Sequence, residues 1–445
     1  MTDSGNKLRP ARTLAVKNFS VIKDAETVPL EFGKITVLIG PQSSGKSLLC
    51  KLAYFLGSGV IGIAVESLLD RYTWDAFLET ATRELNDRFS TNGWLKTTSS
   101  ARFSSRDYAA EAIGVGDVLQ PKMKIEFSPA VKDLYHKIFE NPSKRTSARG
   151  ASRTDLRSDL WVELNLLLDR SHTEENIYIP SGRSLFTDPS KAIATLQNPE
   201  IDHVTRQFSG LIAWDSKWKV GLQTLGRNVV QGIENEMQRI VGGFVSISDG
   251  RPVFIASDGR ILPLRMLSSG ALELLPMFSV LNRAAYEQEH RSARISTIRI
   301  PPFADISYHN PRIYLEEPEA EVFPATQYDL VRLFASLSKD PELDFHWVIT
   351  THSPYILSAF NNLIEAGQAT RNNPNLHDEV AKIIPEQYWI KEGDFKAYAI
   401  EDGKLKSILN ENGFVEGNYL DQVSETIGDE FDRLIKLEYD HAKAS

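Results

Sequence analysis

Cysteine is almost absent from this sequence, which carries one thiol, Cys50, among 445 residues. A single cysteine excludes an internal disulfide and any zinc site built from several cysteines. A chain without disulfides suits a reducing compartment, so we expect a cytoplasmic protein. Because Cys50 follows the start of an apolar helix, we expect it to be a small core residue rather than a redox switch.

An excess of positive charge is also missing. The formal net charge is −9, so no global field draws the chain to DNA or to an anionic membrane. Positive residues gather in the segment 144–157, which contains Lys144, Arg145, Arg149, Arg153 and Arg157. This segment is either a solvated loop or a contact for an acidic trigger protein or DNA. No aromatic residue lies between its arginines, so stacking on single-stranded bases is not supported.

Long apolar runs are the third absence. Lys7, Arg9 and Arg12 are not followed by an apolar segment, which predicts no signal peptide. No apolar run approaches the length that crosses a bilayer. We therefore expect no membrane contact.

The most specific motif present is a glycine loop between an apolar run, residues 34–39, and an apolar helix. It reads G-x-x-x-x-G-K-S in the strand–loop–helix context of a phosphate-binding loop. In such a loop, backbone N–H groups surround the phosphates, the lysine adds charge at the β and γ positions, and the serine hydroxyl binds Mg²⁺. The predicted nucleotide-binding residues are Gly40, Pro41, Gln42, Ser43, Ser44, Gly45, Lys46, Ser47 and Leu48.

Carboxylates follow a second apolar run, residues 312–315, in the order Glu-Glu-Pro-Glu. At the end of a strand, Glu316 would reach Mg²⁺ through water and Glu317 would polarise the attacking water. A solvated turn is the alternative for such a run. His352 ends a third apolar run, where an imidazole could hydrogen-bond the γ-phosphate. A helix-capping or core histidine is the alternative there.

Two further segments are candidates for ligand contacts. Ser268, Ser269 and Gly270 open a predicted helix over 271–285, where hydroxyl and N–H groups suit an anion. The alternative is an ordinary helix N-cap. Because the glycine loop already covers the chain's own phosphates, this cradle would serve the nucleotide of another subunit. Arg183 follows a predicted strand over 176–180 and is a candidate for the nucleotide or an oligomer interface, with a surface arginine as the alternative.

These patterns predict an α/β P-loop NTPase with a β-rich N-terminal lobe and a helical insertion. We expect the helix after the loop to end at Gly57-Ser58-Gly59 and a hairpin to turn at Asp402-Gly403. The expected domains are an N-terminal lobe with the loop at 1–64, a helical insertion at 65–175, the rest of the ATPase core at 176–362 with a projecting helical arm at 199–241, and a C-terminal tail subdomain at 363–445.

The order of the glycine loop, Leu-Ser-Ser-Gly, Glu-Glu-Pro-Glu and Thr-His-Ser-Pro resembles the ABC-type ATPase heads of the RecF, SMC and OLD group. The segments 16–19 and 351–355 resemble the OLD-like branch most. The resemblance implies ATP and Mg²⁺ as cofactors, held by Lys46, Ser47 and Glu316. It also implies a catalytic Glu317, a switch residue at His352, and Ser268 and Gly270 acting in trans.

The sequence departs from this group at several positions. Gln42 stands where Asn is frequent, Ala271 where Gln or Glu is frequent, and Glu321 and Val322 where a His is frequent. No glutamine-loop residue can be placed. These departures bear on the turnover rate more than on nucleotide binding.

OLD nucleases carry a Toprim domain after the head, but no Toprim-like acidic constellation follows His352. Compact ATPases of this kind resemble the ATP-binding components of prokaryotic antiphage systems of the PARIS and Septu types. We therefore expect a homo-oligomeric ATPase that acts as sensor and scaffold and controls a separate Toprim- or HNH-type nuclease. The alternatives are a RecF- or SMC-like DNA-repair or chromosome-maintenance ATPase, and a nucleotide-gated interaction protein with little turnover.

Overall fold

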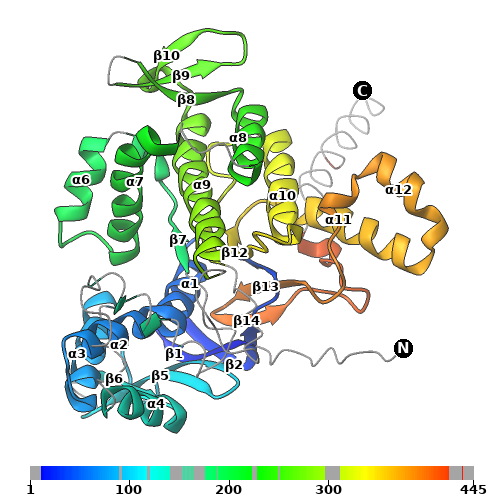
Figure 1. Cartoon of the computed structure of the whole chain (residues 1–445). Coiled ribbons are helices and arrows are strands. Elements are labelled where there is room, and N and C mark those ends of the chain that lie inside the picture. Colours follow the sequence, from blue (N-terminus) through cyan, green and yellow to red (C-terminus); the bar gives the residue numbers. More distant parts are fainter. Residues whose placement is uncertain are drawn as a thin grey trace, which may run out of the picture.

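The fold is built on one large mixed sheet with helices on both faces (Figure 1). In the described part of the chain this sheet has 11 strands in the order β6-β5-β4-β1-β2-β14-β13-β3-β12-β11-β7. The computed structural model describes positions 153, 156, 157, 160, 161, 164 and 433 and residues 12–89, 93–117, 121–140, 176–187, 189–222, 228–248, 251–295 and 311–419.

The centre of the sheet is parallel. It consists of β7 (Ile177–Ile179), β11 (Arg312–Glu316), β12 (His346–Thr351), β3 (Ile35–Ile39) and β13 (Phe395–Glu401). All residues of β11 and β12 are buried, as expected for parallel strands covered on both faces. In the ladder Glu316 pairs with Thr350, and Thr351 pairs with Ile39. The carboxyl ends of β11, β12 and β3 are therefore level at one edge.

A mostly antiparallel lobe, in which only β14 and β2 pair in parallel among the described strands, extends one side of this centre and confirms the predicted β-rich N-terminal part of an α/β P-loop NTPase. Its strands are β14 (Lys404–Ser407), β2 (Ile22–Glu31), β1 (Thr13–Phe19), β4 (Ser100–Ser105), β5 (Tyr108–Val115) and β6 (Lys122–Phe127). A separate small sheet contains β8 (Gly243–Ser248), β9 (Arg251–Ala256) and β10 (Ile261–Pro263).

Two apolar cores lie on opposite faces of the sheet, and β3 contributes to both. Leu38 packs into the first core, and Ile35 and Val37 pack into the second, as alternation along a strand requires. The first core includes α1 (Lys46–Tyr54), α2 (Val60–Leu69), α3 (Trp74–Arg88) and α4 (Pro129–Glu140). The second includes α7 (His203–Leu222), α8 (Asn228–Val241), α9 (Ser269–Ile295), α10 (Pro324–Lys339) and α11 (Pro354–Asn372). The remaining helices are α6 (Pro189–Gln197) and α12 (His377–Ile383).

The helix after the glycine loop does not end at Gly57-Ser58-Gly59, so that prediction is wrong. α1 continues through a π-helical turn, Phe55–Gly59, into α2. Gly57 permits a close contact, because a Cβ there would lie 3.2 Å from Phe103 Cζ. Inside the turn, the Leu56 carbonyl accepts a hydrogen bond from the Tyr108 hydroxyl. Contacts with the antiparallel lobe thus stabilise a turn that helices rarely adopt.

We expected no apolar run long enough to cross a bilayer. The continuous helix of α1, the π-helical turn and α2 shows that this expectation is wrong. Lys46–Leu69 is long and apolar enough to cross a membrane by length and composition, with a mean hydropathy of 1.9. However, 72% of its most apolar window is buried in the described structure. Its apolar composition is therefore explained by its position in the core between the sheet and α3.

Several predictions about the outer parts of the chain are also wrong. The region 65–175 contains strands β4 to β6 and is not a helical insertion. The hairpin at 402–403 forms as predicted, but β13 pairs with β3 in the main sheet, so 363–445 is not a separate tail subdomain. The arm at 199–241 does not project, because α7 and α8 pack against α9. Predicted helices at 155–168 and 418–439 lie largely outside the described residues, and the domain boundaries stay predictions.

The π-helical turn generates a test of stability. Tyr108→Phe removes a buried hydrogen bond to the Leu56 carbonyl, since both residues are at most 1% exposed. We expect the free energy of unfolding, measured by urea denaturation, to fall by about 0.5–1.5 kcal/mol. Tyr72→Phe, at an exposed tyrosine, is the control and should change nothing. Equal stability of the two variants would contradict a role for this bond.

Candidate nucleotide-binding site

The glycine loop joins β3 to α1, in the strand–loop–helix arrangement that its motif predicts. Gly45 caps α1 with φ at 106°, a conformation that favours glycine, and a Cβ there would lie 2.6 Å from Ile22 Cδ1. A Cβ on Gly40 would lie 2.9 Å from Ser44 Oγ. The loop therefore folds tightly over the N-terminus of α1. Its tip is exposed at Pro41, Gln42 and Ser43, whereas Ser44, Ser47 and Leu48 are half-buried.

Lys46 is buried beneath this loop. Its Nζ donates hydrogen bonds to the carbonyls of Gly40 at 2.8 Å and Pro41 at 2.9 Å. Burial lowers the pKa of the amine, and the carboxylates of Glu317 and Glu319 oppose that shift by raising it. Two carboxylates that follow β11 therefore lie within electrostatic reach of the loop lysine. Cys50, on the same helix, is a buried core residue as predicted, and burial raises the pKa of its thiol.

Glu316 ends β11 and is 6% exposed. Its Oε1 accepts a hydrogen bond from the Tyr178 hydroxyl at 2.6 Å, and its Oε2 accepts one from the Ser181 N–H at 3.2 Å. Burial and the charge of Glu316 raise the pKa of Tyr178 well above its usual value, which keeps the hydroxyl protonated as a donor. The carboxylate is thus held in one orientation. Sequence reasoning missed Tyr178, because nothing distinguishes it from the other buried residues of β7.

Glu317 and His352 lie side by side at this edge, after β11 and β12. The distance from Glu317 Oε1 to His352 Nε2 is 3.4 Å. Both side chains are partly exposed, so His352 is not a core residue. It is not the helix cap either, because the hydroxyl of Ser353 caps α11 by accepting from the Tyr355 N–H. Both alternatives raised for His352 are therefore wrong.

Glu319 is a site residue to which the sequence gave no role. Its Oε1 accepts hydrogen bonds from the His352 N–H at 2.6 Å and from the Thr351 hydroxyl at 2.8 Å. It therefore joins the segment after β11 to the segment after β12. The sequence did offer one indication of this role, because Glu319 is the third carboxylate of Glu-Glu-Pro-Glu.

The Ser268-Ser269-Gly270 segment opens α9, as predicted, but it does not lie over the glycine loop. Ser268 Oγ accepts from the Ala271 N–H at 3.3 Å, which is the geometry of a helix N-cap. Ser269 Oγ donates to Glu321 Oε2 at 3.2 Å, and a Cβ on Gly270 would lie 2.5 Å from the Glu321 carbonyl oxygen. The segment is therefore next to the turn that follows β11, with both serines exposed.

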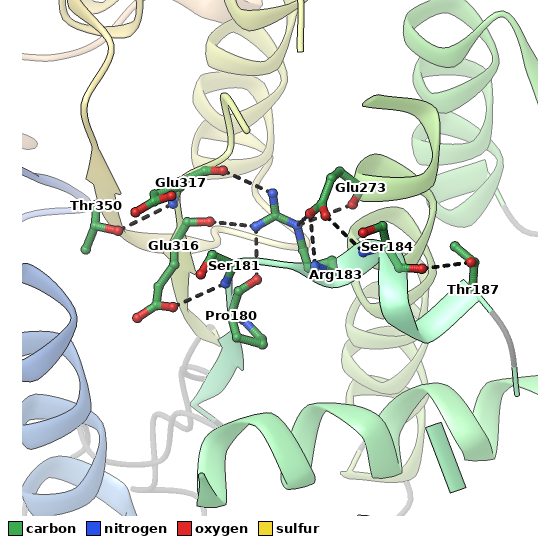
Figure 2. A network of polar contacts seen from close by, with 9 residues as sticks. All are labelled: Pro180, Ser181, Arg183, Ser184, Thr187, Glu273, Glu316, Glu317 and Thr350. Atoms are coloured by element: carbon green, nitrogen blue, oxygen red, sulfur yellow. Dashed lines mark hydrogen bonds and ion pairs between the residues drawn. The ribbon is translucent and has the colours of Figure 1, made fainter. Parts of the chain in front are cut away.

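Arg183 is fully buried, so the surface alternative is wrong. Figure 2 shows it between the end of β11 and α9, with its guanidinium toward the Glu316 and Glu317 carbonyls on one side and Glu273 on the other. Sequence reasoning placed Arg183 near the nucleotide site but missed Glu273, because the pair spans 90 residues of sequence.

A magnesium–triphosphate fits the residues at this edge. Among the described residues, Ser44 Oγ in the loop is buried without a hydrogen-bond partner, which a ligand oxygen would satisfy. In the same part of the chain, no three His, Cys, Asp or Glu side chains form a metal cage. Mg²⁺ rarely needs one, because it is bound through one or two carboxylates together with substrate phosphates. The predicted ligands Ser47 and Glu316 would make a partial set of this kind.

The position of Lys46 generates a test of nucleotide binding. Lys46→Ala removes the loop cation and should abolish the rise in melting temperature that ATP produces, since stabilisation by a ligand requires binding. Without nucleotide the variant should still fold, with a melting temperature lowered by the loss of the two Lys46 hydrogen bonds. Lys51→Ala, on the same helix and paired with Asp202, is the matched control and should keep the ATP-dependent rise. A rise in melting temperature with ATP as large in Lys46→Ala as in the wild type would contradict this account.

Comparison with solved structures gives similarities of low identity. A Smc head bound to the C-winged helix domain of ScpA is 11% identical, with a TM-score of 0.42 over 90% of this chain and 97% of that one. A Smc head with an extended coiled coil, bound to the C-terminal domain of ScpA from Pyrococcus furiosus, gives 11% and 0.38 over 90% and 96%. An ATP-binding cassette of an ABC transporter in its ADP conformation gives 12% and 0.32 over 94% and 98%.

No curated protein matches this sequence. A family model described as the AAA ATPase domain matches residues 126–357, slightly more than half of the chain. The matched range includes Glu316, Glu317 and His352 but not the glycine loop. The chain belongs to the family of this AAA ATPase domain.

Proposed function

We propose that this chain hydrolyses ATP at the edge where β3, β11 and β12 end. The observation that supports this most is the grouping of Lys46, Glu317 and His352 there. Glu317 raises the pKa of Lys46, and its carboxylate lies 3.4 Å from the His352 ring. A loop cation, a carboxylate and an imidazole at one place are the parts that phosphoryl transfer to water requires.

In this mechanism the N–H groups of the glycine loop and Lys46 bind the β and γ phosphates. Ser47 and Glu316 would hold Mg²⁺, which would neutralise charge on the phosphates. Glu317 orients the attacking water and accepts its proton. His352 donates a hydrogen bond to the γ-phosphate, and Glu319 holds the backbone of His352 in place. Tyr178 keeps the Glu316 carboxylate turned toward the site.

We also propose that two copies of the chain pair, so that Ser268, Ser269 and Gly270 of one copy contact the nucleotide of the other. Within one chain, the cradle lies beside the Glu321 turn that follows β11, two strand spacings, roughly 10 Å, from β3. Both of its serines are exposed, so they can face a second copy. Exposed apolar side chains beside the site support a protein interface there. They are Met266, Phe323 and Tyr355, at 67%, 76% and 57% exposure.

For the cellular role we propose a sensor and scaffold that controls a separate effector, a Toprim- or HNH-type nuclease, in antiphage defence. The motif order shared with such ATPases supports this role, and such a nuclease encoded beside this chain would strengthen it. In the basic segment, Arg153 pairs with Glu66 and Asp70, and Arg157 pairs with Glu66. These ion pairs neutralise the positive charge of two arginines that would otherwise attract the phosphates of DNA. Duplex binding with a steep salt dependence would instead favour the DNA-repair alternative.

The proposed role of Glu317 leads to a kinetic prediction. Glu317→Gln keeps the size of the side chain but removes the base, so phosphate release at saturating ATP should fall roughly 10²–10⁴-fold. The affinity for ATP should not fall, because the loop contacts are intact. Glu379→Gln, at an exposed carboxylate of α12, is the control and should hydrolyse ATP like the wild type.

Two outcomes would count against this proposal. Equal rates of phosphate release by wild type and Glu317→Gln would show that Glu317 is not the catalytic carboxylate. The slow variant should also accumulate with ATP bound, so its mass in solution should rise when ATP and Mg²⁺ are added. An unchanged monomer mass at micromolar protein would contradict the pairing of two copies.

A further inference from the structure

A buried ion pair connects two parts of the site that the ATPase mechanism above leaves separate. Arg183 is 0% exposed and Glu273 is 4% exposed, and neither was given a role in hydrolysis. Arg183 lies in the short helix Arg183–Thr187 after β7, and Glu273 lies near the start of α9, close to Gly270. The closest guanidinium–carboxylate contact is 3.4 Å, from Arg183 Nε to Glu273 Oε2.

One side of the guanidinium binds the main chain at the end of β11. Arg183 Nη1 donates to the Glu316 carbonyl at 2.6 Å and to the Pro180 carbonyl at 3.1 Å. Arg183 Nη2 donates to the Glu317 carbonyl at 3.1 Å. Two of these bonds go to the backbone oxygens of Glu316 and Glu317, the residues proposed to bind Mg²⁺ and water (Figure 2). Arg183 thus restrains the main chain that carries both carboxylates.

The restraint matters because Glu317 has an unfavourable backbone conformation. Its φ is +42°, in the left-handed region, which a residue with a side chain adopts at a cost of roughly 1–2 kcal/mol. Such a conformation persists only where neighbours hold it on both sides. The Glu317 N–H donates to the Thr350 carbonyl at 2.9 Å, and its own carbonyl accepts from Arg183. Loss of the second contact would leave the direction of the Glu317 side chain less well defined.

The other side of the pair holds the start of α9. The Glu273 carboxylate accepts from the Arg183 N–H at 2.9 Å and from the Ser184 N–H at 3.1 Å. The Glu273 carbonyl accepts from Arg183 Nε at 3.3 Å. Both hydrogen bonds between Arg183 and Glu273 are buried, where charge-assisted hydrogen bonds have a fixed geometry. A shift of α9 would therefore move Arg183.

We propose that the Arg183–Glu273 pair is a positioning device that transmits the position of the Ser268-Ser269-Gly270 segment to the backbone of Glu316 and Glu317. The proposal rests on the proposed ATPase function. Contact of that segment with a second copy would move or fix α9, and Arg183 would then align Glu317 for the attack of water. Neither residue touches the nucleotide, so both act through the main chain.

Arg183→Lys and Glu273→Gln test this proposal. Lysine keeps the charge but cannot span four carbonyls and a carboxylate, and glutamine keeps the shape but loses the charge. We expect each variant to bind ATP without Mg²⁺ like the wild type, and to show a kcat lowered roughly 10- to 100-fold. The double variant should be no slower than Arg183→Lys alone, because the two residues act as one unit. Arg283→Lys, paired with Glu287 on the same helix, is the matched control and should be unchanged.

Measuring both kcat and melting temperature distinguishes a positioning role of Arg183 and Glu273 from a purely structural one. A lower melting temperature with unchanged kcat, measured well below that temperature, would overturn the proposal. A normal kcat of Glu273→Gln beside a slow Arg183→Lys would also overturn it, because Arg183 would then act without α9. Should the single variants not fold, Arg183→Met combined with Glu273→Leu removes both buried charges and is expected to fold. The kcat of this double variant should be as low as that expected of Arg183→Lys. A kcat equal to that of the wild type would overturn the proposal.

Failure of the ATPase proposal would be visible separately, in the wild type. If neither the wild type nor Glu317→Gln releases phosphate, the Arg183–Glu273 pair is tested by ATP binding instead. The quantity measured is the increase in ATP affinity when Mg²⁺ is added. Arg183→Lys and Glu273→Gln should both lose that gain, because Glu316 is held by the same bonds. If both variants keep it in full, the proposal is wrong.

Discussion

The parallel register of three strands is the constraint on which the rest of this structure depends. Glu316 pairs with Thr350, and Thr351 pairs with Ile39, so β11, β12 and β3 end at the same level. The next residues along each strand are Glu317, His352 and the glycine loop. A shift of one residue in either ladder would turn alternate side chains to the other face and separate these groups. The site therefore follows from backbone pairing in the core.

Buried polar groups mark this edge within an otherwise apolar core. Lys46, Glu316, Arg183 and Glu273 are at most 6% exposed, and each has partners that offset the cost of its burial. Tyr178 fixes Glu316, and Glu319 ties the β11 turn to the β12 turn. The edge is thus held in the places where chemistry needs fixed positions, by Tyr178, which lies outside the recognised motifs, and by Glu319, a motif carboxylate to which the sequence gave no role.

Sequence reasoning succeeded where the signal is local and failed where it depends on distant contacts. The glycine loop and the strands before Glu316 and His352 were predicted, because each is a short run with a defined pattern. The end of α1 at Gly57 was wrong, since contacts with β4 and β5 stabilise the π turn. The place of β13 beside β3 was missed because no local pattern sets strand order. Glu273 was missed for the same reason.

The central claim is that these strand ends form one magnesium–ATP site that a second copy completes. The most direct measurement is an experimental structure of Glu317→Gln with ATP and Mg²⁺. We predict the β and γ phosphates at Lys46, the metal between Ser47 and Glu316, and Ser268 to Gly270 of a second copy at the γ-phosphate. A nucleotide remote from Glu316 and His352, or a γ-phosphate contacted only by its own chain, would contradict the account.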